Sequence, residues 1–274
     1  MSGVWPLVAV AVAAPTAAVL AAVVIRSAPP SLLVENRMGR VVPAVLGWGL
    51  VGGAVIGLMA VELLWAGAGK SSALMLGGLA LVTLLAAGFL DDLRGRHARG
   101  FRGHLGSLIR GRVTTGIVKL VVGLAVGLWL AVWADGGPVR VAVSALLIVV
   151  SINLWNALDV VPGRALKWGI VALGPVLAVG LDGSAGVLAG AGLGAAVAVL
   201  PFDLRQRGML GDAGSNPLGL LAGLGLALLL PTWGIAAAAA AALALQVAAE
   251  TVTISRLIEA VPPVRWFDRL GRRT

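Results

Sequence analysis

Long apolar runs separated by short polar segments dominate this chain of 274 residues. Runs of about 17–25 apolar residues are long enough to cross the hydrocarbon core of a bilayer as helices. The pattern predicts nine spans, at residues 4–25, 41–66, 73–90, 113–133, 141–158, 168–181, 185–200, 217–231 and 233–255. We therefore expect an all-α, multi-pass membrane helical bundle that forms one domain over residues 1–274.

Composition supports this class of protein. Only 12% of the residues are charged, and the mean hydropathy is +1.00. The first run has no basic segment before it and no small-residue cleavage site after it, which favours a retained span over a signal peptide. The chain has no cysteine, so disulfides, thiolate catalysis and cysteine-ligated metals are excluded.

The basic residues sort to one side of the predicted bundle. With nine spans, Lys70 and Arg140 fall on one side and the other 19 of the 21 basic residues fall on the opposite side. The positive-inside rule makes the basic side cytoplasmic, with the N-terminus outside and the C-terminus inside. The net charge of +9 is therefore a topology signal, and we expect a membrane protein with no nucleic-acid partner.

Acidic residues at the ends of apolar runs are the candidate chemistry. Asp91 and Asp92 end the run that begins at Ala73, while Asp159 and Asp212 occupy similar places further along the chain. Ionised groups at a membrane boundary are costly and usually functional. Because all four acids fall on the predicted cytoplasmic side, they point to one composite site.

Polar neighbours accompany these acids. Asn153 and Asn156 precede Asp159 at intervals of three, so the three side chains lie near one helical face. Asp212 stands in a glycine-rich segment, residues 211–219, where we expect a turn just before a helix whose free N–H groups favour phosphate. Lys119, about two turns into the fourth predicted span, reaches the same boundary.

Acids, a glycine-rich turn and basic residues together suit Mg²⁺-assisted chemistry on a pyrophosphate. Mg²⁺ prefers one or two carboxylates together with phosphate oxygens. Each feature also has a structural interpretation. Asp91, Asp92 and Asp212 could cap helices, Asn153 and Asn156 could join helices by hydrogen bonds, and Lys119 could extend its amine to the interface.

Four ordered segments carry a family resemblance: residues 36–49, 88–92, 153–159 and 211–219. The second matches G-F-x-D-D, the third matches the start of N-x-x-N-x-x-D-G-x-D-G-L, and the fourth matches G-D-x-G-S-x-x-L-G. In this order the chain resembles the polyprenyl-phosphate N-acetylhexosamine-1-phosphate transferases. That family includes the phospho-N-acetylmuramoyl-pentapeptide transferases and the N-acetylglucosamine-1-phosphate transferases.

The resemblance implies transfer of a sugar-1-phosphate from a nucleotide-diphosphate sugar to undecaprenyl phosphate, which begins a lipid-linked cell-envelope glycan such as peptidoglycan. It implies a bacterial-type cytoplasmic membrane location and leaves a homodimer open. Asp91 or Asp92 would bind or deprotonate the lipid phosphate, with Lys119 beside them. Asp212 and Asp92 would ligate Mg²⁺.

The same resemblance places the remaining candidates at the donor. Asp159 would belong to the catalytic set, beside the nucleotide-sugar, and the substrate-binding residues would be Asn153, Asn156, Gly211, Gly214 and Ser215.

Two positions depart from the family pattern. Pro162 replaces the second acid of the third motif, and Met209 stands where an aromatic residue is usual. In the family these positions help to hold uracil. They motivate a second hypothesis, a family-derived membrane scaffold or polyprenyl-phosphate-binding partner without donor binding. A small-solute transporter is disfavoured, because the acids cluster at one face rather than near the bilayer midplane.

Overall fold

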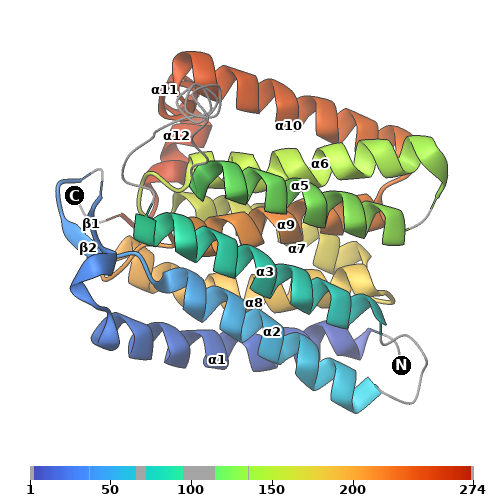
Figure 1. Cartoon of the computed structure of the whole chain (residues 1–274), viewed down its shortest axis with the longest axis horizontal. Helices are drawn as coiled ribbons and strands as arrows, with labels where there is room; N and C mark the ends of the chain where they lie inside the picture. Colours follow the sequence, from blue (N-terminus) through green and yellow to red (C-terminus); the bar gives the residue numbers. More distant parts are fainter. Residues whose placement is uncertain (1–2, 37, 66–71, 95–114, 135, 273–274) are drawn as a thin grey trace.

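The chain folds as a bundle of helices in a computed structural model that describes residues 3–36, 38–65, 72–94, 115–134 and 136–272. The long helices are α1 (Val4–Ser27), α2 (Leu46–Trp65), α3 (Ser72–Arg94), α5 (Thr115–Trp133), α6 (Gly137–Leu158), α7 (Arg164–Val179), α8 (Ser184–Leu204), α9 (Asp212–Leu229) and α10 (Thr232–Val252). They lie side by side (Figure 1). The all-α class predicted from the apolar pattern is confirmed.

Seven of the described helices, α1, α2, α3, α5, α6, α8 and α10, are long and apolar enough to cross a membrane. The multi-pass class is thus supported by length and composition. The shorter helices α7 and α9 coincide with two further predicted spans, and the count of nine and its orientation stay predictions. Residues 95–114, which hold much of the predicted basic loop, lie outside the described residues.

A small hairpin precedes α2, where the sequence predicts helix from residue 41. Strand β1 (Leu33–Glu35) pairs antiparallel with β2 (Val41–Pro43), after the short 3₁₀ helix η1 (Pro30–Leu32). The side-chain oxygen of Asn36 accepts hydrogen bonds from the N–H groups of Met38 and Arg40, at 2.9 and 3.0 Å. This side chain organises the turn, so the prediction of helix over residues 41–45 is wrong.

Close packing of small residues joins α1 to α2. Ala9, Ala13, Ala17 and Ala21 form a fully buried stripe at intervals of four on α1. Opposite them are Gly49, Gly53 and Gly57 of α2, and a Cβ atom added to Gly53 would lie 2.5 Å from the Cβ of Ala17. Membrane helices associate largely through such close contacts, because lipid leaves little hydrophobic drive between them. The repeated Ala and Gly therefore set this helix pair.

Helix α9 is almost entirely buried among α2, α3, α6, α7 and α8. A Cβ atom on Gly219 would lie 2.5 Å from the carbonyl oxygen of Ser151 on α6, and one on Gly223 would lie 2.9 Å from the Cα of Ile148. At its C-terminal end, the Arg140 guanidinium donates to the carbonyl oxygens of Ala227 and Leu230, at 2.8 and 3.1 Å. A cation there complements the helix dipole.

Two short helices, α11 (Ile254–Ala260) and α12 (Pro262–Arg269), follow α10. Figure 1 shows them at the end of the bundle where the hairpin and the N-terminus of α9 also lie, which we call the site end.

Helix α3 approaches α9 so closely at Gly88 that we expect substitution there to disrupt the bundle. A Cβ atom on Gly88 would lie 2.3 Å from the carbonyl oxygen of Asp212, and this backbone cannot rotate away. Gly88→Ala should therefore cost about 2 kcal/mol or more of stability through overpacking, measured by thermal unfolding in detergent micelles.

Gly78 on the same helix is the matched control, because an added Cβ would meet no atom within 4 Å. Gly78→Ala should keep the wild-type stability or raise it slightly, since alanine favours helix. Equal melting temperatures for the two variants would contradict the close approach of α3 and α9.

Candidate acidic site at the N-terminus of helix α9

Helix α9 begins at Asp212, five residues earlier than the sequence predicts. Gly211 precedes it with φ of +68°, a conformation that favours glycine. A Cβ atom there would also lie 2.6 Å from a carboxylate oxygen of Asp92. Gly211 is thus required for both the backbone turn and the approach of Asp92. The expected turn before the helix is real, but it is shorter than predicted and Asp212 lies inside the helix.

The Asp92 carboxylate caps α9 from a different helix. Its two oxygens accept hydrogen bonds from the N–H groups of Asp212 and Ala213, each at 3.0 Å. The next two N–H groups, of Gly214 and Ser215, bond to the carbonyl oxygen of Gly211. A carboxylate at this end also complements the helix dipole. The N–H groups predicted to bind phosphate are therefore hydrogen-bonded to other groups of the protein.

Lys119 joins two of the predicted acids. Its ammonium forms an ion pair with Asp91 at 3.2 Å and a second, shorter one with Asp212. Asp91 also accepts a hydrogen bond from the hydroxyl of Thr115, one turn earlier on α5. The side chains of Lys119 and Asp91 are 13% and 11% exposed, so the pair is largely shielded from water. Lys119 lies about one turn after Thr115, the first described residue of α5.

Of the two predicted asparagines, Asn156 contacts these acids and Asn153 does not. Its amide donates to the Asp212 carboxylate and, at 3.4 Å, to the hydroxyl of Ser215. Asn153 instead donates to the carbonyl oxygen of Val149 in its own helix, at 3.0 Å. Its predicted substrate contact is untested.

The two small residues of the α9 motif are buried. Ser215 is fully buried, and Gly214 packs against α2, where an added Cβ would lie 2.7 Å from the Cα of Gly47. Their local contacts are therefore packing contacts, and their predicted role in substrate binding is also untested.

Asp159 completes the group, which we call the acidic cluster: Asp91, Asp92, Asp159 and Asp212. It follows the last residue of α6 and accepts a hydrogen bond from the N–H of Gly211. Loss of hydration raises the pKa of Asp159 well above its usual range, and the charges of Asp203, Asp212 and Asp92 raise it further. The four acids that the sequence singles out thus meet around one helix terminus.

Asp203 is a buried acid that sequence reasoning missed. It lies near the end of α8, and its carboxylate accepts the N–H of Gly163 at 2.8 Å. This bond holds the turn that follows Asp159. One sequence feature could have identified Asp203: it is an acid at the end of an apolar run, two residues after Pro201. The apolar pattern instead predicts a polar loop at this position.

A buried ionic network fixes the same turn to the C-terminal helix. Arg164 donates to both carboxylate oxygens of Asp268, at 2.9 and 3.0 Å, and both residues are almost fully buried. Arg272 pairs with Asp268 at 2.7 Å and donates to the carbonyl oxygen of Pro162 at 2.9 Å. Burial acts to raise the pKa of Asp268, but hydrogen bonds and charges of the two arginines lower it overall.

Lys167 adds to this network from the first turn of α7. Its amine donates to the carbonyl oxygens of Phe267, Asp268 and Leu270, at the end of α12. A cation there complements the dipole of that helix. The sequence alone indicates only topology for Arg164 and Lys167, because their partners lie about a hundred residues away.

Within the described part of the chain, no three acidic or histidine side chains are arranged to hold a metal ion. The predicted pair Asp92 and Asp212 is adjacent, but both carboxylates already have protein partners. Asn216, one turn into α9, is 1% exposed and has no hydrogen-bond partner for either amide atom. A Mg²⁺ site here stays a prediction.

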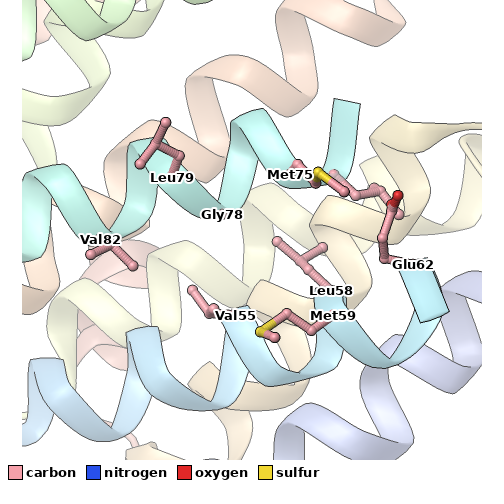
Figure 2. Close-up of a pocket in the computed structure, with 9 residues that line it drawn as sticks. Val55, Leu58, Met59, Glu62, Met75, Gly78, Leu79 and Val82 are labelled. Atoms are coloured by element: carbon pink, nitrogen blue, oxygen red, sulfur yellow. The ribbon is translucent and has the colours of Figure 1, made fainter. Parts of the chain in front are cut away.

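Glu62 lies far from the acidic cluster. Figure 2 shows it at one end of an apolar groove between α2 and α3, lined by Met59, Met75 and Leu79 among others. Gly47 of α2 packs against the start of α9. Glu62 lies about 22 Å from Gly47 along the axis of α2, because a helix rises about 1.5 Å per residue. A charged residue near the end of a candidate span is typical of the membrane–water interface.

A scan of protein-family models and a search of curated proteins found no match to this chain.

The raised pKa of Asp159 predicts a pH-dependent stability effect. In the unfolded chain an aspartate ionises near pH 4, whereas folded Asp159 stays protonated to higher pH. Asp159 therefore lowers the free energy of unfolding above about pH 4, and this loss of stability increases with pH up to the folded pKa of Asp159. Asp159→Asn removes it and can still accept the N–H of Gly211.

We expect Asp159→Asn and wild type to have equal free energies of unfolding near pH 4, with the variant more stable at pH 7 to 8. Denaturant unfolding in micelles across this range tests it. A constant difference at every pH would contradict the electrostatic origin.

Proposed function

We propose that this protein is a membrane enzyme that transfers a sugar-1-phosphate from a nucleotide-diphosphate sugar to a polyprenyl phosphate. One observation carries the proposal. Asp91 and Asp92 of α3, Asn156 of α6 with Asp159 just after that helix, and Asp212 of α9 converge at one end of a membrane bundle. These segments are far apart in sequence, and they are the ones that carry the family resemblance.

The carboxylates present suit a Mg²⁺ ion that binds together with the substrate. The Asp92 carboxylate accepts the backbone N–H of Asp212, so both acids lie at one helix terminus. Mg²⁺ uses one or two carboxylates plus phosphate oxygens rather than an all-protein cage. Because the described residues form no three-ligand group, the remaining ligands would come from phosphate and water. When bound, the ion would supply positive charge to the pyrophosphate.

The protein's own groups account for the rest of the proposed chemistry. The lipid phosphate oxygen attacks the β-phosphorus of the donor, the bond from that phosphorus to the bridging oxygen breaks, and the nucleoside monophosphate leaves. Asp91 accepts a proton from, or orients, the lipid phosphate. Lys119, between Asp91 and Asp212, offsets negative charge that develops on the phosphoryl oxygens.

A specific observation favours a second candidate, a membrane scaffold or polyprenyl-phosphate-binding protein without donor binding. The N–H of Met209 donates to the carbonyl oxygen of Pro43, and its carbonyl oxygen accepts the N–H of Leu46. The carbonyl oxygen of Pro162 accepts from Arg272. These are the two positions that depart from the family's uracil-binding pattern. Both serve internal packing here, and they line a small pocket beside Asp159.

The test is nucleotide release by purified full-length protein with undecaprenyl phosphate, Mg²⁺ and a panel of UDP-, CDP- and GDP-sugars. We expect turnover with one donor class, and we expect Asp212→Asn to reduce it about a hundredfold or more, as for other losses of electrostatic stabilisation. Asp182→Asn is the control, because Asp182 lies in the turn between α7 and α8, outside the cluster.

Full activity of a folded Asp212→Asn variant at saturating Mg²⁺ would contradict the assigned metal role. No turnover with any donor, together with retained binding of undecaprenyl phosphate, would favour the scaffold.

A further inference from the structure

A second polar feature lies at the site end, in a pocket between α1 and α8. It has a volume of about 340 Å³ and is lined by Ala22, Ile25, Arg26, Phe202 and Arg207. None of these residues belongs to the acidic cluster or to the C-terminal ionic network. The pocket is therefore separate from the site described above.

The pocket has an apolar floor and a basic rim. Ala22, Ile25 and Phe202 are partly buried and contribute hydrocarbon, whereas the side chains of Arg26 and Arg207 are exposed. Within the described chain, neither guanidinium has an ion-pair or side-chain hydrogen-bond partner, which sets them apart from Arg164, Arg269 and Arg272. Two unpaired arginines above an apolar surface favour an anionic ligand with a hydrocarbon part.

The loop that carries Arg207 is held in place. The backbone N–H of Arg207 donates to the carbonyl oxygen of Phe202 at 2.9 Å. The neighbouring Gln206 has φ of +54°, which is uncommon for a residue other than glycine. The side chain of Gln206 accepts a hydrogen bond from Asn36 of the hairpin at 3.0 Å. The hairpin therefore supports a constrained loop conformation in which Arg207 lines the pocket.

The pocket lies beside surface that suits lipid. Val19 and Val23, two turns and one turn before the end of α1, are 63% and 52% exposed. Exposed apolar side chains on a membrane-spanning helix face hydrocarbon, and the arginines follow at the helix ends, at the level of headgroups. An acyl chain along this surface would bring its phosphate to the two arginines.

We propose that this pocket binds an anionic phospholipid. Its phosphate lies between the guanidiniums of Arg26 and Arg207, and the first part of an acyl chain lies on Ile25 and Phe202. Guanidinium groups bind phosphate oxygens through paired N–H donors, and basic pockets between membrane helices bind anionic headgroups. The apolar floor selects a lipid over free phosphate. The binding is independent of the proposed transferase activity.

The experiment measures binding of phosphatidylglycerol and phosphatidylcholine to full-length protein in detergent, by native mass spectrometry. Wild type should retain phosphatidylglycerol in preference to phosphatidylcholine. Arg26→Gln and Arg207→Gln should each weaken phosphatidylglycerol binding about fivefold, and the double variant about 25-fold, from the usual contribution of a basic residue near anionic lipid.

Arg205→Gln is the matched control. Arg205 is exposed at the same end of α8 and carries the same charge, but it does not line the pocket. It should bind phosphatidylglycerol as wild type does. An equal loss in this variant would show a non-specific charge effect and overturn the proposal, as would unchanged binding by the double variant.

Competition identifies the occupant. Millimolar inorganic phosphate and an equimolar amount of undecaprenyl phosphate are added separately to the phosphatidylglycerol complex. Retention of phosphatidylglycerol against both supports the proposal. Displacement by inorganic phosphate would mean a simple anion site, and displacement by undecaprenyl phosphate would mean an acceptor site. Either displacement overturns the assignment to phospholipid.

Discussion

The bond between the Asp92 carboxylate and the N-terminus of α9 is the interaction on which the site depends. It joins α3 to α9, satisfies the N–H groups of Asp212 and Ala213, and places a negative charge where the helix dipole favours one. Because Asp212 is the first residue of that helix, the same bond sets the position from which Asp212 reaches Lys119 and Asn156. The guanidinium of Arg140 satisfies carbonyl groups at the opposite end. A central, fully packed helix is thus held at both termini by charges of the appropriate sign.

This arrangement is reached through small residues. Glycine at position 88 lets α3 approach the backbone of Asp212, and Gly211 makes room for the Asp92 carboxylate. Elsewhere, alanines on α1 face glycines on α2, and Gly219 and Gly223 let α9 approach α6. Close backbone contact is the main source of helix association in lipid. Small residues at these contacts are therefore a packing requirement, and at Gly88 and Gly211 they also bring the acids within bonding distance.

Much of the fold could be predicted from the sequence, because apolar runs of membrane length allow few structures other than helices. The convergence of the acids was also predictable, since charge sorting placed Asp91, Asp92, Asp159 and Asp212 at one face. The details could not be predicted. The start of α9 depends on a cap from a residue 120 positions away in the chain, so local propensity puts it too late. The pairing of Arg164 with Asp268 likewise joins distant segments. The second strand of the hairpin, Val41–Pro43, is apolar and leads directly into α2, so the sequence alone predicts it as the start of a span.

The proposed transfer chemistry needs acids held at a fixed spacing beside a cation, and the cap on α9 is the element that would fix them. Hydrogen exchange of residues 208–216 in full-length protein, compared between wild type and Asp92→Ala, tests this cap most directly. The account predicts slow exchange at the N–H groups of Asp212 and Ala213 in wild type, and fast exchange at both in Asp92→Ala while the middle of α9 stays protected. Unchanged protection of these two groups in the variant would contradict the central role of Asp92.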